Sequence, residues 1–172
     1  YVEGCTVPKS GWDVVFRKTG GVDVPDCGKV SAVYVEMKNK HNTMNSAASA
    51  KTYMKMQNKI VRDSHATCML LEEIATRSQN KTWIVTVDGE QFNNEHIRRV
   101  SMDKFYEIVF GDAHAFAKLC RALPDILDDV IEGMSREDNQ NSVFAELAAI
   151  SPDIMKSLYL LALRTYDGFD NF

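Results

Sequence analysis

A strand–helix–strand pattern in the first half of the chain constrains its fold more than any other feature. Residues 29–38 alternate apolar and polar side chains, so we expect a strand with Glu36 and Lys38 on one face. A helix is predicted over residues 47–62. The apolar block at 66–75 is consistent with a strand or with a continuation of the helix, and its short length beyond a polar turn favours a strand. Two strands joined by a helix are typical of an α/β fold, in which the helix crosses over a sheet.

Other segments of the first half predict further strands and loops. Residues 12–17 alternate as in a half-buried strand that includes Asp13, and residues 82–87 are the clearest strand after the apolar block. The segment 19–28 has the turn residues of a connecting loop. Ser46 follows a polar loop and is the expected N-cap of the crossover helix.

The second half of the chain has a helical pattern. Three consecutive helices are predicted, starting at Ser101, Asp112 and Pro124 and ending at Gly111, near Leu123 and at Ile131. A last helix is predicted from Ser151 to near Gly168. Because no linker separates the two halves, we predict a single domain over residues 1–172, with a sheet-rich core at about 12–90 and a helical part at about 101–168.

The composition suits a globular domain that needs no covalent staple. With 172 residues, of which 45% are hydrophobic, the chain can bury an ordinary core. The four cysteines are scattered, which predicts reduced thiols and neither a zinc site nor a disulfide framework. There is no apolar run of about 18 residues and no signal-peptide pattern, so we expect a cytoplasmic protein without a membrane segment. The chain begins at Tyr1 and not at methionine, so we expect it to be a piece of a longer protein whose upstream segment is missing from this sequence.

Charge is unevenly distributed along the chain. The net charge of −4 argues against broad nonspecific binding of nucleic acid. Residues 37–62 nevertheless contain no Asp or Glu and six Lys or Arg residues. Four of these cations recur at helical spacing and form one stripe: Lys51, Lys55, Lys59 and Arg62. The stripe is equally consistent with a surface for a phosphate backbone and with an ordinary solvated helix face.

An isolated acid and a Glu-x-Lys triplet form the candidate catalytic constellation. Asp13 lies on the first predicted strand, and Glu36 follows 23 residues later, near the end of the next. Two carboxylates at adjoining ends of paired strands can hold Mg²⁺ while the ion keeps several of its waters, and the backbone carbonyl of Met37 is a further candidate ligand. Lys38 can then position and help deprotonate a water that attacks a phosphodiester. The alternative is that Glu36 and Lys38 form an ordinary ion pair on a solvent-exposed strand.

The residues around this constellation resemble the active-site region of PD-(D/E)xK nucleases. The match consists of Trp12-Asp13-Val14-Val15-Phe16 and of the tract from Tyr34 to Asn45, in which Glu-x-Lys is followed by Asn-Lys-His-Asn-Thr-Met-Asn. This tract is similar to that of type II restriction endonucleases that cut GGNCC or GGWCC sites, and the similarity extends from about Trp12 to about Leu123. Two features depart from the family pattern: Trp12 replaces the proline of the motif, and the usual first helix would lie upstream of this sequence.

The resemblance implies an α/β fold with a mixed central sheet flanked by helices and a helical C-terminal part. It also implies a Mg²⁺-dependent hydrolase of double-stranded DNA, in which Asp13 and Glu36 bind the metal and Lys38 is the catalytic lysine. A palindromic target would be read most simply by a homodimer. Rival interpretations are a repair or recombination nuclease of the same fold, and a DNA-binding or interaction domain without catalysis.

Further polar residues are candidates for DNA contacts. Lys40 belongs to the basic stretch, and Asn42 and Asn45 can both donate to and accept from base edges or phosphates. Turn and capping roles are equally consistent with the two asparagines. Arg98 and Arg99 follow the last predicted strand and suit bidentate contacts with guanine, with surface ion pairs as the alternative.

Overall fold

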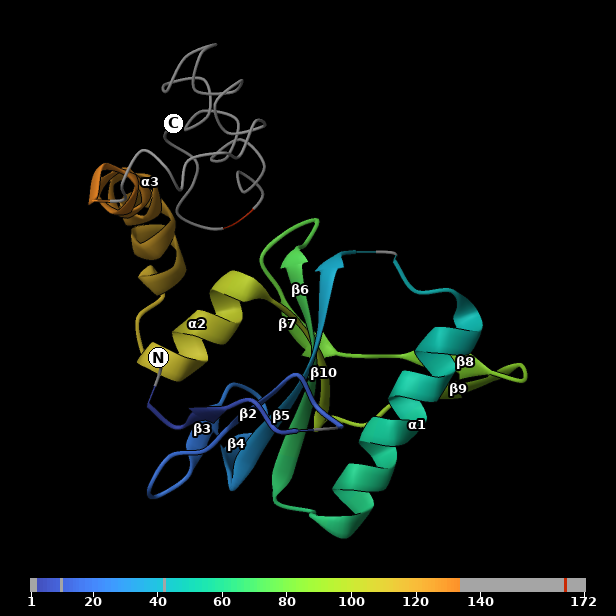
Figure 1. Ribbon diagram of the computed structural model, residues 1–172. Helices are drawn as coiled ribbons and strands as arrows, with labels where there is room; N and C mark the ends of the chain where they lie inside the picture. Colours follow the sequence, from blue (N-terminus) through green and yellow to red (C-terminus); the bar gives the residue numbers. More distant parts are fainter. Residues whose placement is uncertain (1–2, 10, 42, 134–165, 167–172) are drawn as a thin grey trace.

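A mixed sheet forms the centre of the molecule. The computed structural model describes residues 3–9, 11–41, 43–133 and 166 (Figure 1). Within these residues the sheet has six strands, which are, in spatial order, β1 (Cys5–Thr6), β2 (Val14–Phe16), β5 (Ala32–Lys40), β6 (Ala66–Ile74), β10 (Ile97–Ser101) and β7 (Asn80–Thr82). The three central strands β5, β6 and β10 run parallel to one another. At the two sides of this group, β2 pairs antiparallel with β5, and β7 pairs antiparallel with β10. The predicted mixed central sheet is therefore confirmed.

Helices cover both faces of the sheet. The helix α1 (Ser46–Arg62) lies on one face, and α2 (Met102–Phe110) and α3 (Ala115–Gly133) lie on the other side of the sheet (Figure 1). Each face has its own apolar core. On the α1 face, Tyr53 and Met56 pack against buried side chains of β5 and β6, and on the opposite face Phe105 and Phe116 pack with Val33 and Val35. This arrangement confirms an α/β fold with flanking helices.

The crossover helix α1 begins one residue earlier than its predicted cap implied. Its N-cap is Asn45, whose Oδ1 accepts a hydrogen bond from the backbone N–H of Ala48 at 2.8 Å. Ser46 is the first helical residue. Lys59 and Arg62 lie in the last turn, where positive charge stabilises the carboxyl end of the helix dipole. The helix, and the strand β6 that follows it, confirm the predicted crossover.

The structure has two hairpins that the sequence did not predict, one in the predicted loop at 19–28 and one at the end of the predicted strand at 82–87. Part of the predicted loop is the hairpin of β3 (Val22–Val24) and β4 (Gly28–Val30). The predicted strand at 82–87 is divided, because residues 80–82 pair with β10 whereas β8 (Val85–Val87) pairs with β9 (Glu90–Phe92) across a tight turn. That turn needs left-handed backbone at two consecutive residues, which Asp88 (φ 51°) and Gly89 (φ 85°) supply.

The helical half agrees with the sequence in part. The helix predicted between Ser101 and Gly111 is confirmed as α2, and Gly111 ends it in the left-handed conformation at φ 69°. The predicted boundary at Pro124 is wrong, because α3 continues through this position as one helix. The last predicted helix lies outside the described residues, except for Tyr166, which is 1% exposed and accepts a hydrogen bond from the Ala75 N–H. Among the residues described, no helix is both long and apolar enough to cross a membrane.

Candidate active site

The register of β2 and β5 brings the two predicted carboxylates together. Val14 pairs with Val35, and the backbone N–H of Asp13 donates to the Val35 carbonyl at 3.0 Å, so Asp13 lies opposite Glu36. Residues directly opposite one another in an antiparallel pair share a face of the sheet. The Asp13 carboxylate also accepts a hydrogen bond from the Met37 N–H, with Oδ2 at 2.7 Å, which fixes it against β5.

Glu36 lies between two ammonium groups from different elements. Lys38, two residues later on the same strand face, places its Nζ 3.3 Å from Glu36 Oε1. Lys55 of α1 places its Nζ 2.6 Å from Glu36 Oε2. The Glu36 side chain is only 19% exposed, so two positive charges compensate a carboxylate that is largely removed from water. The three residues Asp13, Glu36 and Lys38 therefore converge as the sequence predicted.

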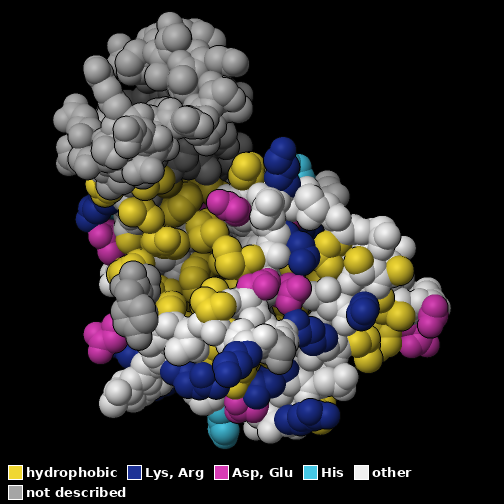
Figure 2. Space-filling model, viewed as in Figure 1, with side chains coloured by type: hydrophobic (Ala, Val, Ile, Leu, Met, Phe, Trp, Pro, Cys, Tyr) yellow, Lys and Arg dark blue, Asp and Glu magenta, His cyan; other side chains and the backbone are white. Residues whose placement is uncertain are grey.

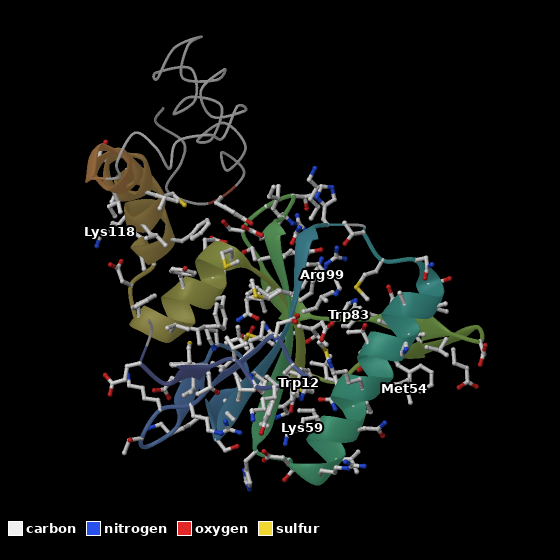
Figure 3. All side chains as sticks on the ribbon, in the orientation of Figure 1. Trp12, Met54, Lys59, Trp83, Arg99 and Lys118 are labelled. Carbon is white, nitrogen blue, oxygen red and sulfur yellow. The ribbon has the colours of Figure 1, made fainter. Side chains whose placement is uncertain are left out.

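Aromatic rings line the approach to this carboxylate. The Nζ of Lys55 lies 4.3 Å from the centre of the Trp12 ring, and the Nζ of Lys59 lies 4.2 Å from the centre of the Tyr34 ring. Both are cation–π distances. Trp12 and Lys59 lie toward one end of the region between the sheet and α1, and Arg99 and Trp83 lie toward the other (Figure 3).

These contacts divide the basic stripe of α1. Lys55 and Lys59 turn toward the sheet, and Lys59 also forms an ion pair with Asp63 at 3.8 Å. Lys51 and Arg62 are exposed. In Figure 2, Lys and Arg side chains lie in a broken line down this face of the molecule, with acidic side chains near its middle. The stripe is therefore partly a lining of the candidate active site and partly a solvent-exposed helix face.

Two pockets meet at the Glu-x-Lys segment. One is open to solvent and is lined by Asp13, Glu36, Lys55 and Trp12, together with residues of the preceding loop. The other lies beyond Lys38, which lines it with Lys40, Glu72 and Arg99. The first pocket is therefore bordered by both carboxylates. Lys38 borders the second pocket and pairs with Glu36 of the first, so it lies between them.

The donor set fits a hard divalent cation. Asp13 and Glu36 contribute carboxylate oxygens, the ligands that Mg²⁺ prefers, and Mg²⁺ commonly binds through one or two carboxylates while keeping several waters. Within the part of the chain that the structure describes, no group of three or more His, Cys, Asp or Glu residues is arranged to hold a metal. The residues present thus suit an ion that shares its coordination with water and substrate, and not a closed structural site.

Glu72 belongs to this region, although the sequence analysis did not single it out. It lies opposite Lys38 in the β5–β6 register and is 2% exposed. Its Oε1 lies 2.5 Å from Nη2 of Arg99, and its Oε2 accepts from the Gln79 side chain at 3.2 Å. The available signal was an acid at the end of an apolar strand that runs parallel to the Glu-x-Lys strand.

The structure separates the candidate DNA contacts. Lys40 is exposed beside the second pocket, and Asn45 caps α1 through one side of its amide. Asn42 lies outside the described residues. For Arg98 the structure favours the ion-pair alternative over a DNA contact. Its side chain is 3% exposed, and its guanidinium donates a hydrogen bond to Asn80 and pairs with Asp26 at 2.9 Å on the face that carries β3 and β4.

The two arginines separate because residues 97–101 form a strand, whose neighbouring side chains point to opposite faces of the sheet. Arg99 therefore lies on the α1 face, where it pairs with Glu72. The buried guanidinium of Arg98 already has its hydrogen-bond partners within the fold.

The cysteines offer no nucleophile at this site. All four are free, in agreement with the predicted reduced thiols. Cys68 is the cysteine of the α1-face core, where burial raises its pKa to about 12. The thiol is therefore protonated and unreactive at neutral pH.

Comparison with known proteins relates the chain to restriction endonucleases. The family model for the Eco47II restriction endonuclease matches residues 1–132. The type II restriction enzyme Sau96I of Staphylococcus aureus is 30% identical over 126 residues, in an alignment that covers 68% of this chain and 48% of that enzyme. The chain thus spans about half the length of the curated relative that it matches. No solved structure matches the chain significantly.

Proposed function

Because this chain belongs to the Eco47II restriction endonuclease family, we propose that it hydrolyses phosphodiester bonds of double-stranded DNA at a short specific site, using Mg²⁺. The observation that carries the proposal is the placement of Asp13 opposite Glu36, with Lys38 on the same strand face as Glu36. This is the constellation expected of a PD-(D/E)xK nuclease. Similarity to enzymes that cut GGNCC or GGWCC supports a target of that kind.

Asp13 and Glu36 would hold the metal, with the Met37 carbonyl as a further ligand. The bound ion would supply charge neutralisation at the phosphate and a lowered pKa of the attacking water. Asp13 is already oriented by the Met37 N–H, and Glu36 by its two lysines. Asp13 therefore needs little rearrangement to present an oxygen to a cation at the open pocket, whereas Glu36 must share or release a lysine contact.

Lys38 would act on the attacking water and on the phosphate. Its ammonium can hold a water by hydrogen bonding and exchange a proton with it, and its charge stabilises the charge that develops on the phosphate oxygens. Its position beside Glu36 keeps this group within reach of the same pocket. Removal of the charge should therefore reduce the rate of cutting more than the binding of DNA.

DNA would be bound by cations and amides around the site. Lys40, Lys51 and Arg62 are exposed and are available for phosphates, whereas Lys55 and Lys59 would contribute from the lining of the site. Asn45 retains amide groups that its capping bond does not use, and Asn42 remains a candidate from the sequence alone. A palindromic target favours a homodimer.

Cleavage of plasmid DNA in the presence of Mg²⁺ tests the proposal. The isosteric variants Glu36→Gln and Asp13→Asn should reduce cutting by at least about 100-fold, because each removes a charged ligand that is needed in the transition state. The matched control is Asp23→Asn, an exposed acid on β3, which should cut as the unmodified chain does. Equal cutting by all three variants would refute the assignment of the site.

The pattern of products separates the rival functions. Discrete bands that map to one sequence support a restriction endonuclease. Nicking that depends on DNA structure and not on sequence would indicate a repair or recombination nuclease of the same fold. Binding of DNA without any metal-dependent cutting would indicate a domain that lacks catalytic activity.

A further inference from the structure

A strongly basic pocket lies beyond the carboxyl ends of β5 and β6. It is lined by His41, Thr76, Arg77, Gln79, Lys81 and Arg99, and no acid is among these residues. Arg99 also lines the pocket that Lys38 borders, so the two cavities are neighbours. From Lys38 to His41 the strand and its end span about 10 Å, at about 3.3 Å per residue.

Two of the cations oppose one another across paired strands. In the antiparallel register of β7 and β10, Lys81 lies opposite Arg99. Like charges in this position repel each other, which costs stability unless a counter-charge lies between them. Lys81 and Arg77 are exposed, and neither forms an ion pair within the described part of the chain. The pocket therefore carries positive charge that the described residues do not neutralise.

A buried acid holds one wall of the pocket in place. Glu72, 2% exposed, binds both Arg99 and Gln79, so two lining side chains are oriented by one carboxylate from below. Glu72 pairs with Arg99 through one oxygen, and its second oxygen accepts a hydrogen bond from the uncharged amide of Gln79. The Nε of Arg99 is buried and has no hydrogen-bond partner among the described residues. Glu72 therefore fixes the positions of Arg99 and Gln79 and, within the described residues 43–133, forms no ion pair with Arg77 or Lys81.

We propose that Arg77 and Lys81, with Arg99 held between Glu72 and Lys81, form a second DNA contact that binds a backbone phosphate about three nucleotides from the scissile one. This inference rests on the proposed function and adds to it a surface separate from α1. An oxygen-rich anion would bridge Arg99 and Lys81 and relieve their repulsion. Successive phosphates of one strand rise by about 3.4 Å along the axis, so about 10 Å from Lys38 corresponds to roughly three nucleotides.

Salt dependence of DNA binding tests this contact. The affinity of the full chain for a short fluorescent duplex is measured by anisotropy in EDTA, so that no strand is cut, over a series of salt concentrations. Each phosphate contact contributes about 0.9 to the slope of log K against log salt. The double variant Arg77→Ala, Lys81→Ala should lower the slope by about one and the affinity at least about tenfold, equally for different sequences.

Two control variants, compared with the unmodified chain, make the outcome decisive. Lys18→Ala removes an exposed lysine that lines a pocket with residues of α2, and its slope should stay unchanged. Lys81→Arg keeps the charge and should restore most of the affinity that Lys81→Ala loses. If the unmodified chain binds and cuts DNA while the double variant behaves as Lys18→Ala does, the second contact is refuted. If the unmodified chain neither binds nor cuts DNA, the proposed function itself fails.

Discussion

The ammonium of Lys55 lies 2.6 Å from Glu36, closer than that of Lys38 at 3.3 Å. Lys55 comes from the crossover helix and also stacks over Trp12, the residue that precedes Asp13. A carboxylate proposed to hold a metal is thus already paired with a protein cation. Any divalent ion that binds Glu36 must share or displace the Lys55 contact.

We therefore expect Lys55→Met to bind divalent cations more tightly than the unmodified chain. Methionine keeps most of the length of the side chain over Trp12 but removes the competing charge. A gain of about fivefold or more in affinity for Mn²⁺ is expected, measured by calorimetry in the absence of DNA. Lys51→Met, one turn earlier and exposed, is the matched control. Weaker binding by Lys55→Met would mean that the lysine orients Glu36 and does not compete.

The pair of Glu72 and Arg99 predicts a large effect on stability. Arg99→Ala leaves the carboxylate of Glu72, 3% exposed, without its charged partner. Removal of one partner from a buried pair is strongly destabilising, and because the Arg99 side chain is 26% exposed we expect a loss of roughly 2–4 kcal/mol in the free energy of unfolding. Urea denaturation measures it. Arg62→Ala, at an exposed position near the end of α1, should change stability by about 0.5 kcal/mol or less.

Burial of Cys68 predicts a loss of stability at alkaline pH. Desolvation raises the pKa of its thiol from 9.0 to about 12 in the folded chain. Between these values the unfolded chain releases a proton that the folded chain keeps, so stability falls as pH rises through this window. At pH 10 the loss amounts to about 1.4 kcal/mol relative to neutral pH. Urea denaturation of Cys68→Ala should show a pH dependence between 8 and 10 that is smaller by about this amount.

The strand–helix–strand core and the carboxylate pair were accessible to sequence reasoning because local pattern determines them. The alternation that places Glu36 and Lys38 on one face is a property of the strand itself. The separation of 23 residues along the chain between Asp13 and Glu36 is consistent with two neighbouring strands. The inward turn of Lys55 was not accessible, because helical periodicity predicts a stripe but not which of its members contact the sheet.

Arg98 and Arg99 show that the sequence pattern of a strand also does not identify the contacts of its side chains. A run of two adjacent arginines resembles a surface loop in the sequence, yet in β10 one of them is buried against Asp26 and the other pairs with Glu72. Both partners are far away along the chain, and no local signal identifies them. Likewise, Glu72 gains its role only through the parallel register with β5, which is a tertiary feature.

Asn45 offers a test that separates a structural from a DNA-binding role. Its Oδ1 accepts the capping bond from the Ala48 N–H, so Asn45→Ala should lower the free energy of unfolding by about 1 kcal/mol, whereas Asn45→Asp should keep the cap. A DNA contact would respond differently. Aspartate would add negative charge toward the phosphates and weaken duplex binding, measured by anisotropy, while thermal denaturation remains unchanged. Asn45→Asp with unchanged stability and unchanged DNA affinity would show that Asn45 acts only as a helix cap.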